Sequence, residues 1–384
     1  MKSFYTLLVS QWLANTGDVL YIVALIALLY QQTGSALMAV SFPIAVTAGM
    51  TLSGFFFARI LSRYSLGKTL VLSQLMKTVT LVLVLFTDSI LVLGLVLFIA
   101  FLDGFARPIQ ASFIPRLTTN RQQANSLVQG SNQFIQLAMW CSGRCSSLTS
   151  SAIALIVSLV LFSLSTIVTI YFYQSLTEDI VDDETDESIT LRDSLTYVRT
   201  SPFARRVTGF VTYESFVSTL WISALLLVYL ERHLQVDPGW WGTLNASFLI
   251  SMIAASAYLY RSRRAPSLPS TAVLSIVSAL LFGVTEHLAF AILALVIQGA
   301  ATQIRIIQTN TVIQEQIPTT QLPYVYSVQQ TGYALAFSMG SLLFGLLADG
   351  LPIDSVYLLG AFLTIPLIWI GRLTEQSILT ASSV

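Results

Sequence analysis

Residues 90–112 read ILVLGLVLFIAFLDGFARPIQAS, and this stretch decides the class of fold. Its first half is apolar and carries no charge, whereas Asp103 and Arg107 follow one helical turn apart near its end. A helix needs roughly 20 predominantly apolar residues to cross a membrane. The stretch therefore predicts a membrane-spanning helix with two charged side chains on one face.

The composition of the whole chain agrees with that reading. The 384 residues are 55% hydrophobic and only 10% charged, and their formal net charge is zero. Their mean hydropathy is +0.75, and a soluble domain carries about 25% charged residues. These values exclude an ordinary soluble enzyme and a disordered chain. The lack of a basic run excludes a nucleic-acid partner, so the lipid bilayer is the expected environment.

Similar apolar stretches recur along the chain, separated by short polar turns. They predict an all-α membrane protein with twelve transmembrane helices near 4–30, 36–58, 69–87, 90–112, 123–146, 150–174, 207–230, 239–260, 271–285, 288–309, 324–347 and 353–371. Basic residues are concentrated in the loops of one side, which hold 14 of the 19. Cytoplasmic loops carry this excess. We therefore expect both termini in the cytoplasm and the protein in the inner (cytoplasmic) membrane.

The charged segment 175–206 divides the predicted spans into two groups of six. It holds 12 of the 38 charges, and its part 189–198 has the apolar spacing of an amphipathic helix at the membrane surface. We expect an N-terminal bundle over 1–174 and a C-terminal bundle over 207–384. Gly104 and Gly299, 195 residues apart, open similar stretches that end at Gly130 and Gly332, 202 residues apart. The two bundles are therefore expected to be pseudo-symmetric.

Short motifs around the fourth and fifth spans carry a family resemblance. Residues 105–111 read FARPIQA, 114–117 read IPRL, 124–127 read ANSL, and 30–35 read YQQTGS. Together they resemble the macrolide-efflux-type drug exporters of the major facilitator superfamily. The resemblance implies the major facilitator fold, alternating-access transport and a role for Arg107 in proton coupling. The chain departs from the family pattern after the second span, where Ala58 and Ser62 replace Gly and Asp.

Charged residues inside the predicted spans are candidates for ion coupling, since each costs about 2.5–3.5 kcal/mol to place at the bilayer centre. The proton-coupling candidates are Asp18, Asp103, Arg107 and Glu214. In one interpretation, movement of Arg107 relative to the carboxylates changes their proton affinity. In the other, Asp103 and Arg107 form a fixed pair. Lys77 is interpreted as a structural residue that extends to the interface or pairs with a neighbouring helix.

Polar stripes at helical spacing predict a substrate pocket for flat apolar molecules. The substrate-binding candidates are Asn15, Tyr21, Asn132, Gln136, Trp221, Gln298, Arg305, Tyr326, Gln329 and Tyr333. Each stripe taken alone is also compatible with hydrogen bonding between helices. Stripes on five helices together favour a shared wet cavity.

No pattern in the sequence predicts catalysis. We find no metal-ligand cluster and no phosphate-binding loop, so we expect neither an enzyme, nor a metal site, nor a cofactor. The chain is thus predicted to export amphipathic or hydrophobic small molecules as a monomer, by proton antiport. Alternatives are a same-fold exporter of a siderophore, a lipid or another metabolite, and a membrane receptor or scaffold that does not transport.

Overall fold

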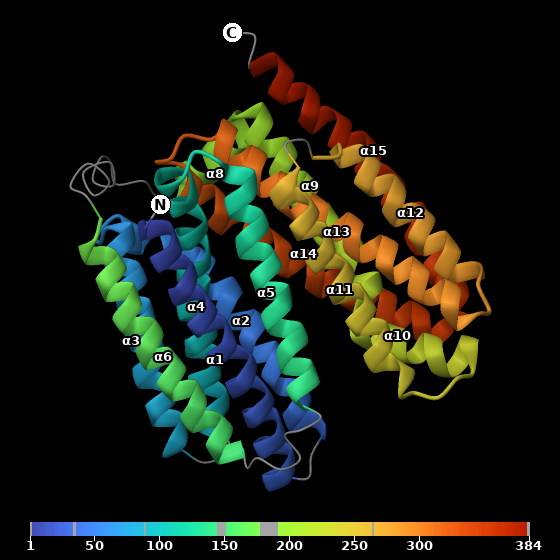
Figure 1. Ribbon diagram of the computed structural model, residues 1–384, viewed down its shortest axis with the longest axis horizontal. Helices are drawn as coiled ribbons and strands as arrows, with labels where there is room; N and C mark the ends of the chain where they lie inside the picture. The colour runs from blue at the N-terminus through green and yellow to red at the C-terminus, as the bar shows by residue number, and fades with distance from the viewer. Residues whose placement is uncertain are drawn as a thin grey trace. The chain divides into compact units, whose positions relative to one another are not determined.

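The computed structural model describes residues 2–33, 36–87, 90–143, 151–176, 191–262 and 265–381. Over this part of the chain the regular secondary structure is entirely helical (Figure 1). By packing, the chain divides into two compact units. Unit 1 comprises Met1–Thr119, Ile135–Tyr197 and Ile317–Thr331, and unit 2 comprises Asn120–Phe134, Val198–Gln316 and Gly332–Val384.

The first half of the chain forms seven described helices. They are α1 (Lys2–Thr33), α2 (Ala36–Leu61), α3 (Leu66–Leu85), α4 (Ile90–Leu117), α5 (Arg121–Gly143), α6 (Ser151–Gln174) and the short α8 (Leu191–Thr200). α8 lies where the sequence predicts an amphipathic helix over 189–198, and its Ser194 and Val198 are buried. The acidic run before it lies outside the described residues.

The second half begins with an interrupted span. α9 (Pro202–Ser218) gives way to a 3₁₀ turn, η2 (Thr219–Trp221), and then to α10 (Ser223–Tyr229) and a π-helical turn, η3 (Leu230–Leu234). Ile222 has an extended backbone between the two α-helices. The span predicted near 207–230 is therefore present but interrupted at Thr219–Ile222. The remaining helices are α11 (Trp240–Arg261), α12 (Leu268–Val284), α13 (Leu288–Gln316), α14 (Leu322–Gly350) and α15 (Ile353–Ala381).

Each of the twelve predicted spans coincides with a helix or with the interrupted run. Among the described residues, ten helices or runs are long and apolar enough to cross a membrane. α12 is shorter at 17 residues. α5 does not meet the same criterion, because glutamine, asparagine and serine fill much of its first half. The arrangement of twelve spans in two six-helix bundles stays a prediction.

Local sequence sets where several helices begin. Ser65, Ser201 and Ser267 each accept a hydrogen bond from a backbone N–H of the first helical turn. A serine in this position satisfies a donor that the helix itself leaves unpaired. Pro202, which has no N–H to leave unpaired, suits the first turn of α9.

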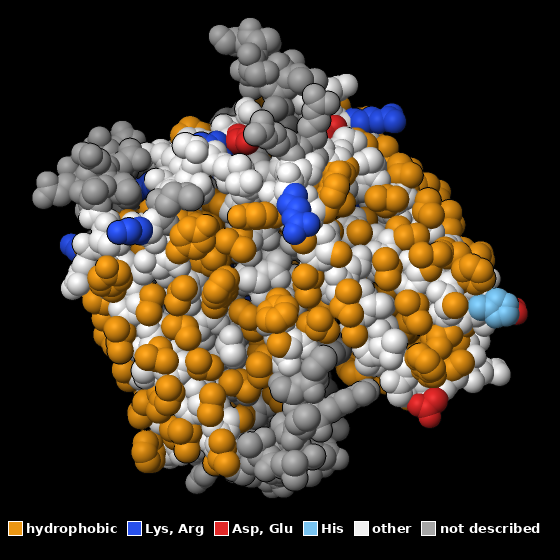
Figure 2. Space-filling model, viewed as in Figure 1, with side chains coloured by type: hydrophobic (Ala, Val, Ile, Leu, Met, Phe, Trp, Pro, Cys, Tyr) orange, Lys and Arg blue, Asp and Glu red, His pale blue; other side chains and the backbone are white. Residues whose placement is uncertain are grey.

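Apolar side chains both fill the units and cover their outsides. In unit 1, Tyr21, Phe42 and Phe162 belong to one buried cluster, and Phe57, Phe105 and Phe113 belong to another. The face seen in Figure 2 is covered mainly by hydrophobic side chains and shows few charged ones. Large exposed side chains such as Phe86, Phe362 and Trp369 are 84%, 67% and 66% exposed. A soluble surface would not present so much apolar area, and lipid tails would cover it.

Candidate functional site

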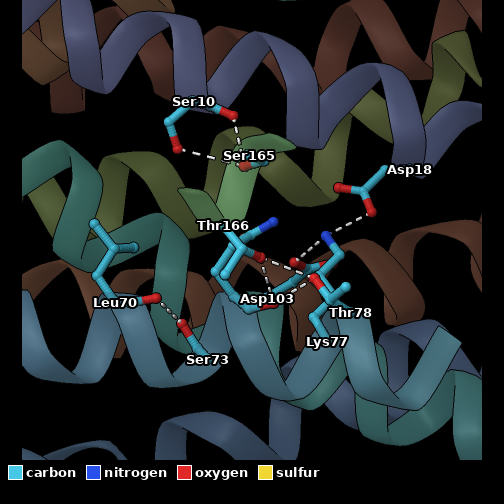
Figure 3. A network of polar contacts seen from close by, with 10 residues as sticks. Ser10, Asp18, Leu70, Ser73, Lys77, Thr78, Asp103, Ser165 and Thr166 are labelled. Carbon is cyan, nitrogen blue, oxygen red and sulfur yellow. Dashed lines mark hydrogen bonds and ion pairs between the residues drawn. The ribbon is translucent and has the colours of Figure 1, made fainter. Parts of the chain in front are cut away.

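Lys77 on α3 brings together two carboxylates that lie far apart in the sequence. Its Nζ atom is 2.6 Å from Oδ1 of Asp18 on α1 and 2.7 Å from Oδ1 of Asp103 on α4. The three side chains are 2%, 17% and 13% exposed. Figure 3 shows the ammonium group pointing between the acids. All three residues lie in unit 1, and we refer to them as the acid–lysine cluster.

The cluster carries one negative charge more than it carries positive charge. Two carboxylates share a single ammonium group in a buried environment, where an uncompensated charge is costly. The two contacts are similarly short, so Lys77 links the Asp18 carboxylate on α1 to the Asp103 carboxylate on α4.

Aromatic rings line the buried side of the cluster. The Lys77 ammonium lies 4.5 Å from the centre of the Phe162 ring on α6, in the geometry of a cation–π contact. Tyr21 packs against Phe162 and Phe42 and is only 2% exposed. This predicted substrate-binding residue therefore supports the cluster from within the core in this structure.

The structure contradicts the predicted Asp103–Arg107 pair. Arg107 is exposed and forms no ion pair with Asp103, which binds Lys77 instead. Pairing with the exposed Arg107 one helical turn away would add only about 0.2–0.5 kcal/mol. Lys77, by contrast, is buried in an apolar helix and must have an anionic partner. The sequence did contain a signal for Lys77, namely a charge in the middle of a span, but not its partners.

Unit 2 contains a second buried charged site. Arg305 on α13 pairs with Glu214 on α9, with Nη2 3.2 Å from Oε1. The guanidinium also donates to Ser275 Oγ at 3.2 Å and to the Thr271 carbonyl oxygen at 3.5 Å, both on α12. Arg305 and Glu214 are 4% and 13% exposed. This site is balanced in charge, and its hydrogen bonds hold the arginine firmly.

The two charged sites occupy equivalent places in the chain. Glu214 follows Asp18 by 196 residues, Ser275 follows Lys77 by 198, and Arg305 follows Asp103 by 202. In each case the three positions lie on the first, third and fourth spans of their half. Ser275 is on the span equivalent to that of Lys77, and Arg305 is on the span equivalent to that of Asp103.

The other predicted residues of unit 2 lie in varied surroundings. Gln298 is 2% exposed and donates to Thr302, one turn away on α13. Trp221 packs on Phe282 and Tyr357 at 5.5 Å between ring centres. Tyr333, 43% exposed, stacks on Phe337. Asn132 is half-buried.

In unit 1, the predicted residues outside the cluster also differ in how exposed they are. Asn15 is half-buried, one turn before Asp18 on α1, and Gln136 on α5 is exposed. Tyr326 and Gln329, on the part of α14 that belongs to unit 1, are 8% and 5% exposed. The cluster therefore brings together only Asp18 and Asp103 of the predicted residues.

No family model matches the chain. Two curated proteins of Bacillus subtilis are similar in sequence. The "Uncharacterized MFS-type transporter YfmI" is 20% identical over 374 residues, covering 93% of this chain and 92% of that protein. The "Uncharacterized MFS-type transporter YjbB" is 25% identical over 347 residues, covering 83% of this chain and 82% of that protein.

Solved structures show the same fold over nearly the whole chain. The human organic anion transporter MFSD10 has a TM-score of 0.77 at 12% identity, with 96% of this chain and 98% of that chain covered. A bacterial homologue of the iron transporter ferroportin in its outward-facing state has a TM-score of 0.74 at 14% identity, with both chains covered completely. The Escherichia coli fucose:proton symporter FucP has a TM-score of 0.75 at 12% identity, with 97% and 98% covered.

These comparisons support an MFS-type transporter. The solved structures show that the chain has the major facilitator fold. The two similar Bacillus subtilis proteins are both named MFS-type transporters. The cargoes named for the structural neighbours differ from one another, so the fold alone does not select a substrate.

Proposed function

We propose that this MFS-type transporter exports amphipathic or hydrophobic small molecules by alternating access, driven by proton antiport. The observation that carries the proposal is the unequal charge of the acid–lysine cluster, two carboxylates around one buried ammonium. One proton neutralises such a group, and its release restores the charge. A buried group with two charge states is what coupling to a proton requires.

The geometry suggests how the cluster works. Asp18 accepts the proton, since its ion pair with Lys77 is the contact that ties α1 to the cluster. Protonation removes the attraction between α1 and α3, while the Asp103–Lys77 bond keeps α3 and α4 together. Substrate and proton thereby favour different arrangements of α1. Coupling follows because each ligand shifts the equilibrium only through its differential affinity for the two arrangements.

The balanced Glu214–Arg305 site takes a different part in this proposal. Its charge is already compensated, and Arg305 has further hydrogen bonds to α12. We therefore assign proton coupling to Asp18 with Asp103, and to Glu214 a pairing role that orients Arg305. Arg107 remains a proposed contributor through its charge, without a direct contact to Asp103.

Aromatic rings and amide groups provide the contacts that we propose for the substrate. Tyr333 and Phe337 stack at 6.0 Å on α14 and can receive a flat aromatic molecule. Gln136 on α5 is exposed and can hydrogen-bond a polar substituent. Asn15, Asn132, Trp221, Gln298, Tyr326 and Gln329 complete the proposed set.

The proposal includes twelve spans in two bundles, 1–174 and 207–384, joined by the linker 175–206. It also includes cytoplasmic termini, the inner membrane and a monomer. A metabolite, siderophore or lipid as cargo is the closest alternative, and a receptor or scaffold that does not transport is the alternative of another class.

The test is transport of a panel of amphipathic dyes, ethidium among them, into inverted vesicles with and without a pH gradient. We expect gradient-dependent uptake that Asp18→Asn abolishes. The matched control is Glu286→Gln, which removes an exposed carboxylate in the turn after α12 and should leave uptake intact. Uptake that is indifferent to the gradient would exclude proton antiport, and no uptake of any dye would favour the alternatives.

A further inference from the structure

The buried face of α3 is polar over most of its length. Thr69, Ser73, Gln74, Lys77 and Thr80 are all 5% exposed or less. The opposite face, which includes Leu72, Leu75, Val79 and Leu83, is apolar and exposed, as lipid contact requires. A helix that only anchored Lys77 would not need polar side chains for two turns before it.

Hydroxyl groups of α1 and α6 continue this polar face. Thr166 lies 2.9 Å from Thr78 and 3.4 Å from the Gln74 carbonyl oxygen. Ser10 lies 2.6 Å from Thr169 and 3.4 Å from Ser165. Figure 3 shows Thr166 and Thr78 near Lys77 and Asp103, and Ser10 next to Ser165. We call the set formed by Ser10, Thr69, Ser73, Gln74, Ser165, Thr166 and Thr169 the polar column.

The members of the column differ in whether the protein satisfies them. Ser10, Ser165 and Thr169 bond to one another, which is the usual way in which hydroxyls hold membrane helices together. Gln74 Nε2 and Thr69 Oγ1 are buried and make no hydrogen bond. Helix–helix bonding therefore explains the first group but not the second. Buried polar groups without a protein partner commonly bind water.

The column is long enough, and suitably placed, to connect the acid–lysine cluster with the end of unit 1 at which α3 begins. Thr69 and Lys77 are eight residues apart, or about 12 Å along a helix. Thr69 lies in the first turn of α3, next to the exposed Lys68. The column therefore extends from the acid–lysine cluster almost to the end of unit 1 where α3 begins. The charge pattern of the loops predicts that this end faces the cytoplasm.

We propose that the polar column binds water through Gln74 and Thr69 and carries protons between Asp18 and the end of unit 1 at which α3 begins. The inference rests on the proposed proton coupling and adds the route. In each transfer, an O–H bond of the Asp18 carboxyl group breaks and one forms on a water molecule. That water passes one of its own protons to the next, and one proton leaves at the end. Asp18 is left ionised beside Lys77.

The test uses Thr69→Val and Gln74→Leu, which keep the side-chain shape and remove the unpartnered groups. The matched control is Thr78→Val, on the same helix and adjacent to Lys77, which removes the hydrogen bond to Thr166. Each variant is reconstituted in liposomes containing a pH-sensitive dye. Proton movement is followed during transport of the dye that wild type transports fastest, in parallel with binding of that dye and thermal unfolding.

We expect Thr69→Val and Gln74→Leu to slow proton movement by about 100-fold, the lower end of what positioned proton-transfer groups contribute. Dye binding and thermal unfolding should stay close to wild type. Thr78→Val should lower the unfolding temperature and leave the rate unchanged. The inference is overturned if both variants move protons at the wild-type rate, or if Thr78→Val slows them equally. Wild type that moves dye but no protons would overturn the proposed function as well, so the two failures are distinguishable.

Discussion

Replacing Lys77 by methionine tests the acid–lysine cluster most directly, because it removes the positive charge and keeps the length of the side chain. Both carboxylate oxygens lie within 2.7 Å of one nitrogen, so they are no more than about twice that distance apart. At an effective dielectric constant of about 20, two unit charges at that separation repel by roughly 3 kcal/mol. Removing one partner of a buried ion pair generally costs about 3–5 kcal/mol. We expect Lys77→Met to lower the free energy of unfolding by that amount at neutral pH.

The assay is denaturant unfolding of purified protein in detergent at about pH 7.5 and about pH 5, with restoring variants as controls. Protonation of one carboxylate removes the repulsion, so the loss should shrink at the lower pH. Adding Asp18→Asn should recover part of the stability, and adding Asp103→Asn as well should recover most of it. A Lys77→Met protein within about 1 kcal/mol of wild type at neutral pH, with no gain from the added changes, would refute the reasoning.

Four further predictions concern single packing and pairing features. Glu214→Gln should destabilise unit 2 by about 3–5 kcal/mol because it leaves Arg305 buried without an anion, and adding Arg305→Met should restore much of the loss in the same unfolding assay. Tyr357→Phe should be neutral or raise stability by up to about 1 kcal/mol, because the Tyr357 hydroxyl is buried without a hydrogen bond. Tyr229→Phe is its counterpart and should cost about 1 kcal/mol, because that hydroxyl lies 2.7 Å from the Phe282 carbonyl oxygen. Gly17→Val should cost about 1–3 kcal/mol, since a β-carbon there would lie 2.6 Å from the Phe162 ring, and an unchanged unfolding temperature would contradict this contact between α1 and α6.

Much of the fold could be predicted from the sequence because lipid imposes one strong rule. An apolar stretch of sufficient length forms a helix, since no water is available to its backbone. The stretches at 36–58 and 353–371 were found in this way, and helices cover both. The break at Thr219–Ile222 was not found, because the side chains there are as apolar as elsewhere in the span.

The site was predicted only in part, for a reason that α4 illustrates. The spacing of residues along one helix shows which side chains share a face, and this favoured Asp103 with Arg107. It carries no information about a neighbouring helix, from which Lys77 reaches both acids. The partners of Lys77 follow from a different rule, namely that a buried cation must have an anionic partner. Applied to Lys77, it leaves Asp18 and Asp103 as the candidate carboxylates, because Asp88, the third of that half, lies between two predicted spans.

The order in which the acid–lysine cluster is made matters for how the chain enters the membrane. A ribosome synthesises Asp18 first, then Lys77, and Asp103 another 26 residues later. A lone charge in the bilayer costs about 2.5–3.5 kcal/mol, so α3 is easier to insert if α1 already presents its carboxylate. In the second half, Glu214 precedes Arg305 by 91 residues and must wait longer for its counterion. In the first bundle, α3 can therefore pair with α1 as soon as it is made. In the second bundle, Glu214 on α9 has no counterion until α13 has been synthesised.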